Sequence, residues 1–155
     1  MDLAIDPEEI KAILTTFIRT YVQNAGSKSV VLGLSGGVDS AVTALLCKDA
    51  LGVKNVLCVF MPDETTPDAD TRHQQLLVKT SHLRCTTIDI APFVHQFQIS
   101  DHRLKLLTVA NIKPRVRMIL LYEIANEHGS IICGTSNKAA MLVGYFTKYG
   151  DGGVD

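Results

Sequence analysis

Apolar residues recur along this chain at two spacings, one typical of helices and the other of buried strands. From Pro7 to about Asn24 they return every three or four positions, which predicts a helix with one apolar face, and Asp6 and Pro7 suit its start. Further helices are predicted at 39–51, 66–83 and 114–129. Short runs that are apolar on both faces predict strands at 29–34, 55–61, 85–90 and 130–134.

Alternating helices and buried strands indicate a parallel sheet that is covered by helices on both faces. We therefore predict a Rossmann-like, doubly wound α/β fold, with residues 1–155 forming a single domain. Ligands of such folds bind beyond the carboxyl ends of the strands. The functional residues are accordingly expected in the segments 35–40, 61–72, 91–113 and 135–155.

Composition and charge exclude several classes of protein. The chain has 155 residues and a formal net charge of −1, which gives no reason to expect nucleic acid as a partner. No apolar run approaches the length of a membrane span, and the first ten residues do not resemble a signal peptide. The four cysteines and five histidines form no ligand-like cluster. We expect reduced, buried thiols and a cytoplasmic protein, with no membrane partner.

The stretch "LGLSGGVDSA" (32–41) stands where a predicted strand passes into a predicted helix. Gly36 and Gly37 allow the backbone to approach a ligand closely, and the N–H groups at a helix start attract anions such as phosphate. Ser35 and Ser40 add hydroxyl donors. Asp39 would repel a phosphate on its own, but it suits a Mg²⁺ ion that bridges to phosphate oxygens. The alternative is a tight turn in which Asp39 caps the helix.

This stretch resembles the pyrophosphate-binding loop, or PP-loop, of the ATP pyrophosphatase superfamily, whose enzymes cleave ATP to adenylate a substrate. Two later segments, "NIKPRVRMILLYEIAN" (111–126) and "GTSNKAAMLVGYFTKYGDGGVD" (134–155), resemble ammonia-dependent NAD synthetases. The likeness runs in order from Val30 to Asp155. It implies an ATP-pyrophosphatase-type, adenine nucleotide alpha hydrolase-like domain.

The residues of these segments also make sense without the resemblance. Arg115 and Arg117, at the start of the helix predicted at 114–129, suit contacts with phosphates or a carboxylate, although solvated arginines would look the same. Thr135 follows a strand and is placed either to donate to a nucleotide or to cap the next helix. The glycine-rich stretch 148–155 has no periodic pattern, and a mobile loop with solvated charges is the simpler interpretation. The acidic stretch 63–70 reads as a solvated loop.

The resemblance assigns a role to each matching position. It implies an ATP site formed by Gly33, Leu34, Ser35, Gly36, Gly37, Val38, Asp39, Ser40 and Thr135, with Asp39 also binding Mg²⁺. It implies deamido-NAD⁺ binding by Arg115, Lys148 and Asp155, and a catalytic position near the reacting centre for Asp151. The reaction implied is the ATP-dependent amidation of deamido-NAD⁺ with ammonia, which yields NAD⁺, AMP and pyrophosphate through an adenylated intermediate. The resemblance further implies a homodimer in which residues 116–125 take part.

Two departures from the family pattern keep other functions open. The family has a second magnesium-binding glutamate where this chain has Ala140, and Asp63, Glu64 or Asp68 are possible replacements. The family sequence also continues well beyond the position of Asp155, so the domain is expected to be truncated relative to it. The alternatives are a catalytically impaired ATP-binding module and an ATP pyrophosphatase with a different acceptor.

Overall fold

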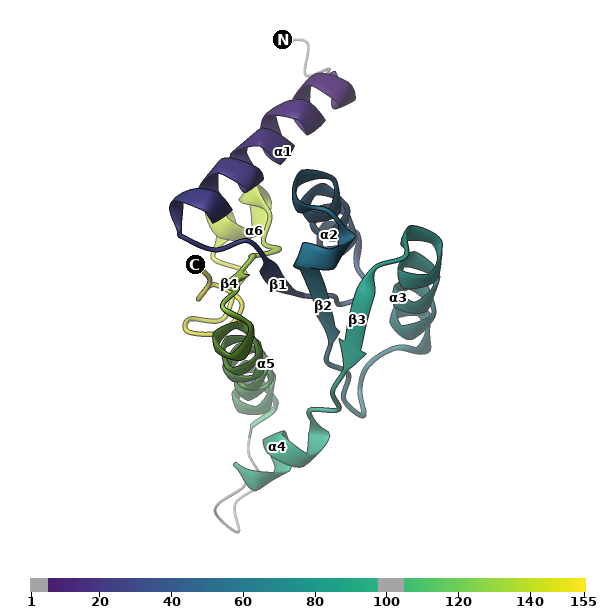
Figure 1. Ribbon diagram of the computed structural model, residues 1–155. Coiled ribbons are helices and arrows are strands. Elements are labelled where there is room, and N and C mark those ends of the chain that lie inside the picture. Colours follow the sequence, from purple (N-terminus) through teal and green to yellow (C-terminus); the bar gives the residue numbers. More distant parts are fainter. Residues whose placement is uncertain (1–5, 98–104) are drawn as a thin grey trace.

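The computed structural model describes residues 6–97 and 105–155. Its helices are α1 (Pro7–Asn24), α2 (Val38–Leu51), α3 (Asp68–Ser81), α4 (Ala91–Gln96), α5 (Leu106–His128) and α6 (Lys138–Val143), with a short 3₁₀ turn, η1 (Val53–Asn55). The strands are β1 (Val30–Gly33), β2 (Val56–Phe60), β3 (Arg84–Thr87) and β4 (Ile131–Ile132) (Figure 1). None of the described helices has the length and apolar character needed to cross a membrane.

The four strands form one sheet in the order β3-β2-β1-β4, and every neighbouring pair is parallel. Val30 of β1 lies beside Val56 of β2 on one side and Ile131 of β4 on the other. The chain therefore winds outward from β1 to β3 and then crosses back to place β4 at the opposite side. This arrangement confirms the predicted doubly wound α/β fold.

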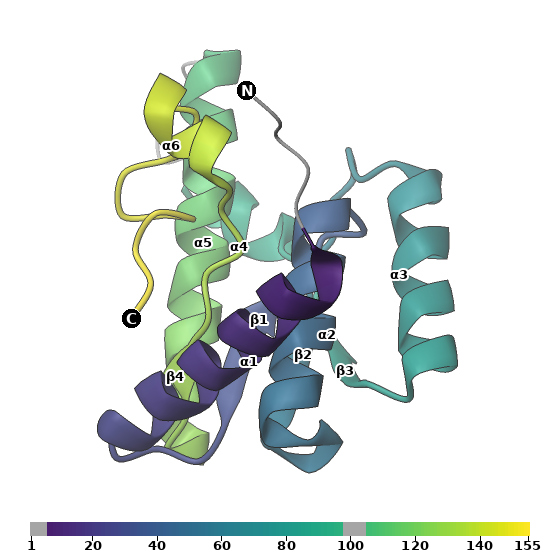
Figure 2. The same cartoon turned by 90° about the horizontal axis from the view of Figure 1, so that it is seen from above.

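Helices cover both faces of the sheet because the strand residues are apolar on both faces. On one face Val30, Leu32 and Cys58 pack against α1, α2 and α3 through residues such as Val22 and Cys47. On the other face a second core, which includes Val31, Val59 and Ile132 of the strands and Val116 and Leu121 of α5, packs α4 and α5 against the sheet. Figure 2 shows α5 on one side of the strands and α2 and α3 on the other.

The strand order reverses between β1 and β4, because the chain places β2 and β3 on one side of β1 and then returns to place β4 on the other side. Such a switch point opens a crevice at the carboxyl ends of the two strands. The loop after β1 leads into α2, and the segment after β4 leads into α6. Both segments were expected to carry the functional residues.

The main error of the prediction concerns α5. The helix was expected to begin at Pro114, because proline is favoured in the first turn. It begins at Leu106 instead and runs through Pro114, with Val109 and Ile112 packed against the core. Arg115 and Arg117 therefore lie in the middle of a helix and not at its start. Helices α4 and α6 were not predicted. Part of the segment 91–113, which was expected to carry functional residues, lies outside the described residues, namely 98–104 with His102.

Candidate functional site

The loop between β1 and α2 brings backbone N–H groups and two serines together at the helix start. Gly36 has a φ of +90°, and a Cβ at this position would lie 2.7 Å from Cα of Asp70, so only glycine fits. Ser40 is buried; its Oγ accepts a hydrogen bond from N–H of Ser35 at 3.2 Å and donates to the carbonyl of Gly37 at 2.9 Å. These contacts hold the first turn of α2 with its N–H groups uncovered, as an anion site requires.

The alternative that Asp39 caps α2 is wrong, because the cap position is Gly37 and no side chain caps this helix. Asp39 is exposed in the first turn, where its Oδ2 accepts a hydrogen bond from Nδ2 of Asn137 at 3.1 Å. Asn137 is also the cap of α6, since its Oδ1 accepts from N–H of Ala140 at 2.8 Å. Thr135 therefore does not cap the next helix.

The side chains around Asp39 supply few ligands for a magnesium ion. The described residues contain no group of three His, Cys, Asp or Glu side chains that would hold a metal without help. Asp39 supplies a carboxylate in the first turn of α2, and Ala140 adds none. Mg²⁺ commonly binds one or two protein carboxylates together with phosphate oxygens and water. The residues thus fit an ion that arrives with a nucleotide, but not a site made by the protein alone.

A cavity of about 440 Å³ lies at the switch point between β1 and β4 and is called the switch-point cavity here. Of the predicted site residues, Gly33, Leu34, Ser35, Thr135 and Asp151 line it. The loop after β2 and the middle of α5 complete the wall. The structure therefore brings the end of the glycine-rich loop, the segment after β4 and the C-terminal stretch to one space.

A charged cluster at this cavity was not predicted. The side chain of Asp63 is only 5% exposed, and its Oδ2 lies 3.1 Å from Nζ of Lys113 and 3.2 Å from Nη2 of Arg117. Its Oδ1 accepts from both the N–H and the hydroxyl of Thr65. Burial alone would raise the pKa of Asp63, but the Thr65 hydrogen bonds and the charge of Lys113 outweigh it and lower the pKa. The interpretation of this stretch as a solvated loop is thus wrong for Asp63.

The cluster joins the loop after β2 to α5. Arg117 adds a second link, because its Nε donates to the carbonyl of Met61 at 3.0 Å. The same loop leads to Asp70, which packs against Gly36. The sequence signal for this cluster is the spacing of Lys113 and Arg117, four residues apart on one helix, and it is visible only once α5 is known to extend through Pro114.

Arg115 and Lys148 lie close together, but neither lines the switch-point cavity. Nε of Arg115 donates to the backbone carbonyl of Lys148 at 3.1 Å, and the Lys148 ammonium lies 5.1 Å from the centre of the Tyr149 ring. The loop that carries Lys148 packs on α5, where a Cβ at Gly150 would lie 2.9 Å from Cβ of Pro114. The expected mobile loop is therefore attached to the helix.

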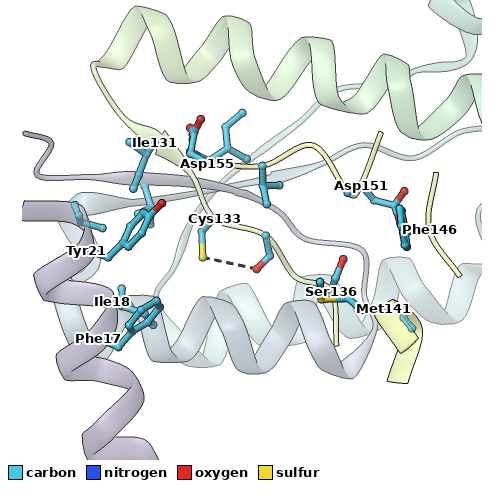
Figure 3. A pocket seen from close by; sticks show the side chains of 17 residues that line it. Phe17, Ile18, Tyr21, Ile131, Cys133, Ser136, Met141, Phe146, Asp151 and Asp155 are labelled. Carbon is cyan, nitrogen blue, oxygen red and sulfur yellow. Dashed lines mark hydrogen bonds between the residues drawn. The ribbon is translucent and has the colours of Figure 1, made fainter. Parts of the chain in front are cut away.

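Asp155 belongs to a second cavity of about 420 Å³, which lies along the outer edge of β4 and is called the edge cavity (Figure 3). The Asp155 carboxylate accepts from N–H of Ile132 at 2.9 Å and from the Tyr122 hydroxyl at 3.3 Å. Asp151 lines both cavities, and its Oδ1 accepts from N–H of Thr147. Asp151 thus stands between the two groups of predicted residues.

Comparison with known proteins gives matches along almost the whole chain. The family model described as NAD synthase matches residues 10–155. An NH(3)-dependent NAD(+) synthetase of Pyrobaculum aerophilum is 43% identical, with 98% of this chain and 58% of the relative covered. The NH(3)-dependent NAD(+) synthetase of Archaeoglobus fulgidus is 42% identical, with 96% of this chain and 60% of the relative covered. The chain therefore spans about three fifths of the length of these relatives.

Solved structures agree with the sequence matches. The NH3-dependent NAD synthetase of Campylobacter jejuni has a TM-score of 0.92 and 37% identity, with 97% of this chain and 66% of that chain covered. The NMN synthetase of Francisella tularensis has a TM-score of 0.91 and 30% identity, with 98% of this chain and 63% of that chain covered. Both likenesses cover almost the whole of this chain.

Proposed function

The chain belongs to the NAD synthase family, and on that premise we propose that it carries the ATP side of an ammonia-dependent NAD synthetase. The proposed reaction is the amidation of deamido-NAD⁺ to NAD⁺, with ATP converted to AMP and pyrophosphate. The observation that supports it most directly is the meeting of the glycine-rich loop, Thr135 and Asp151 at the switch-point cavity. These segments are also the ones that carry the family resemblance.

ATP is proposed to bind with its phosphates at the start of α2. The N–H groups of Val38 to Ser40 and the positive end of the helix dipole favour anions there, and Thr135 is the candidate donor from the segment after β4. Asp39 is the residue that would hold Mg²⁺, and an ion bound there supplies positive charge to the phosphates. The chain's own contribution is to fix the α-phosphate and to keep water away from it.

Deamido-NAD⁺ is proposed to bind towards the C-terminal stretch, where Arg115, Lys148 and Asp155 are the candidate contacts. Its nicotinate carboxylate attacks the α-phosphorus of ATP, and pyrophosphate leaves. Ammonia then attacks the adenylated carbonyl carbon and AMP leaves, so that one proton must be removed from the nitrogen. Asp151 is the candidate acceptor for that proton, since its side chain lines both cavities.

The test is an assay of NAD⁺ formation from ATP, Mg²⁺, deamido-NAD⁺ and ammonium. Wild-type chain is expected to form NAD⁺, and Asp39→Ala to abolish it. Asp49→Ala is the matched control, because Asp49 lies on the same helix and pairs only with Lys11 at 2.8 Å among the described contacts. Loss of activity in both variants, or in neither, would contradict the proposed role of Asp39.

The second candidate is a module that binds ATP without turnover, and Ala140 is the observation that favours it. In that case ATP binds to the wild-type chain, Asp39→Ala weakens binding, and no NAD⁺ forms. Nicotinate mononucleotide in place of deamido-NAD⁺ tests a different acceptor in the same assay. A chain that does not bind ATP at all would exclude both candidates.

The remaining partner assignments are also proposals. We expect a homodimer that uses the outer face of α5, where Ile119 is 62% and Tyr122 is 37% exposed. The apolar stripe of α1 supports the same expectation, since Phe17 is 60% exposed. Light scattering of the purified chain measures the mass directly. A cytoplasmic location remains the expectation from the scattered cysteines.

A further inference from the structure

Two cysteines from distant parts of the chain meet beside the candidate site. Cys47 lies on α2 and is fully buried, and Cys133 follows β4 directly. The Cys47 thiol donates to Sγ of Cys133, with 3.6 Å between the sulfur atoms. Figure 3 shows the Cys133 sulfur turned towards the α2 side of the sheet. Both residues are free cysteines.

A small solute can reach this pair from the candidate site. Cys133 is half-buried and lines both the switch-point cavity and the edge cavity. Cys47 lines neither. The pair thus has one thiol facing an open space and a second thiol behind it, the arrangement of an attacking and a resolving cysteine.

We propose that Cys47 and Cys133 form a peroxide-sensitive thiol pair, which hydrogen peroxide converts into a disulfide across the crevice between α2 and β4. The Cys133 thiolate attacks one oxygen of the peroxide, the O–O bond breaks, and hydroxide leaves to give a sulfenic acid. The Cys47 sulfur then attacks the Cys133 sulfur, and water leaves. In sum, two thiols and one peroxide give one disulfide and two waters.

The contacts of the pair agree with these roles. The hydrogen bond from Cys47 lowers the pKa of Cys133, although burial acts in the opposite direction. The same contact, together with burial, raises the pKa of Cys47, so that Cys133 is the thiol that ionises first. A disulfide has a sulfur–sulfur distance of ~2.05 Å, so the two atoms must approach by about 1.5 Å. The approach requires the two side chains to rotate or the segment after β4 to move towards α2.

The bond would act on the candidate site because of where its ends lie. Cys47 belongs to the helix whose first turn holds the glycine-rich loop, and Cys133 is two residues before Thr135. A shift of Cys133 towards α2 is transmitted to Gly134, which is tightly packed, since a Cβ there would lie 2.8 Å from Val154. Oxidation is therefore expected to weaken ATP binding, a consequence that rests on the proposed function.

The experiment treats the reduced, full chain with hydrogen peroxide and measures two quantities. Peptide mass spectrometry without reduction is expected to find the Cys47–Cys133 cross-linked peptide. Calorimetry is expected to show ATP affinity reduced at least about tenfold, which corresponds to about 1.4 kcal/mol. Dithiothreitol is expected to remove the cross-link and restore the ATP affinity. The same wild-type chain therefore provides the comparison before and after reduction.

Variants assign the effect to the pair. Cys47→Ala and Cys133→Ala are expected to keep their ATP affinity after peroxide, whereas Cys85→Ala remains sensitive. Cys85 is the matched control, because it lies on β3 with Gln74 as its partner. A bond between Cys58 and Cys85, no bond at all, or a cross-link that leaves ATP affinity unchanged would overturn the proposal. If the reduced chain does not bind ATP, the proposed function fails, and the mass spectrum still decides whether the two thiols pair.

Discussion

Replacement of Gly36 by alanine is the sharpest test of the loop geometry. A side chain at a φ of +90° is disfavoured by about 1–2 kcal/mol, and the new methyl group would also overlap the backbone of Asp70. Overpacking of a filled site costs about 1–3 kcal/mol. Together the two effects predict a loss of about 3 kcal/mol of unfolding free energy, or about 6–12 °C in the unfolding midpoint.

The neighbouring glycine provides the control for this prediction. Gly37 has a φ of −82°, and a Cβ there would lie 3.3 Å from the Ser35 hydroxyl, a close contact that a small rotation relieves. Gly37→Ala is expected to cost only about 1 kcal/mol, or about 2–4 °C in the midpoint, because alanine is a poorer cap than glycine but its methyl group meets no backbone there. Thermal unfolding followed by circular dichroism measures both. Equal midpoints for the two variants would refute the argument that Gly36 is fixed by Asp70.

Two further predictions concern the charges around the site. Asp63→Asn leaves Lys113 and Arg117 without their partner and is expected to destabilise the chain by about 2–3 kcal/mol, since both cations are partly exposed. The pKa of Asp63 is below its ordinary 3.8, so the stability that its carboxylate contributes is complete above pH 3.8 and is lost as the pH falls through the lowered pKa. Chemical denaturation should therefore show the stability difference between wild type and Asp63→Asn shrinking in acid. A difference that persists in acid would contradict this account. Ala140→Glu is expected to lower the Mg²⁺ concentration needed for ATP binding, because it adds a carboxylate ligand. Ala140→Gln adds no charge and is expected to leave that concentration unchanged. Equal effects of the two variants would contradict the argument that a carboxylate at position 140 binds Mg²⁺.

The elements with strong local signals were predictable from the sequence. Asp6 caps α1 through the N–H groups of Glu8 and Glu9, and Gly129 ends α5 in the left-handed conformation. Local side-chain chemistry determines both features, so the residues reveal them directly. The parallel sheet was predictable for a similar reason, because its strands are apolar on both faces.

The features that depend on distant contacts were not predictable in the same way. Pro114 reads locally as a helix start, but packing of Val109 and Ile112 continues the helix on its N-terminal side. The burial of Asp63 depends on that longer helix, since Lys113 lies in the part that was missed. The meeting of Cys47 and Cys133 requires the order of strands in the sheet, which the spacing of the elements alone does not give.

The position of β1 in the centre of the sheet has a consequence for folding. Strands β1, β2 and β3 follow one another along the chain, so their pairing requires only short crossovers. The contact between β1 and β4, by contrast, joins distant parts of the chain: directly before the two strands the hydroxyls of Ser29 and Ser130, 101 residues apart, form a hydrogen bond. Closing so long a loop costs entropy before it gains contacts. During synthesis β4 is therefore expected to dock after β1, β2 and β3, because its contact with β1 closes the longer loop.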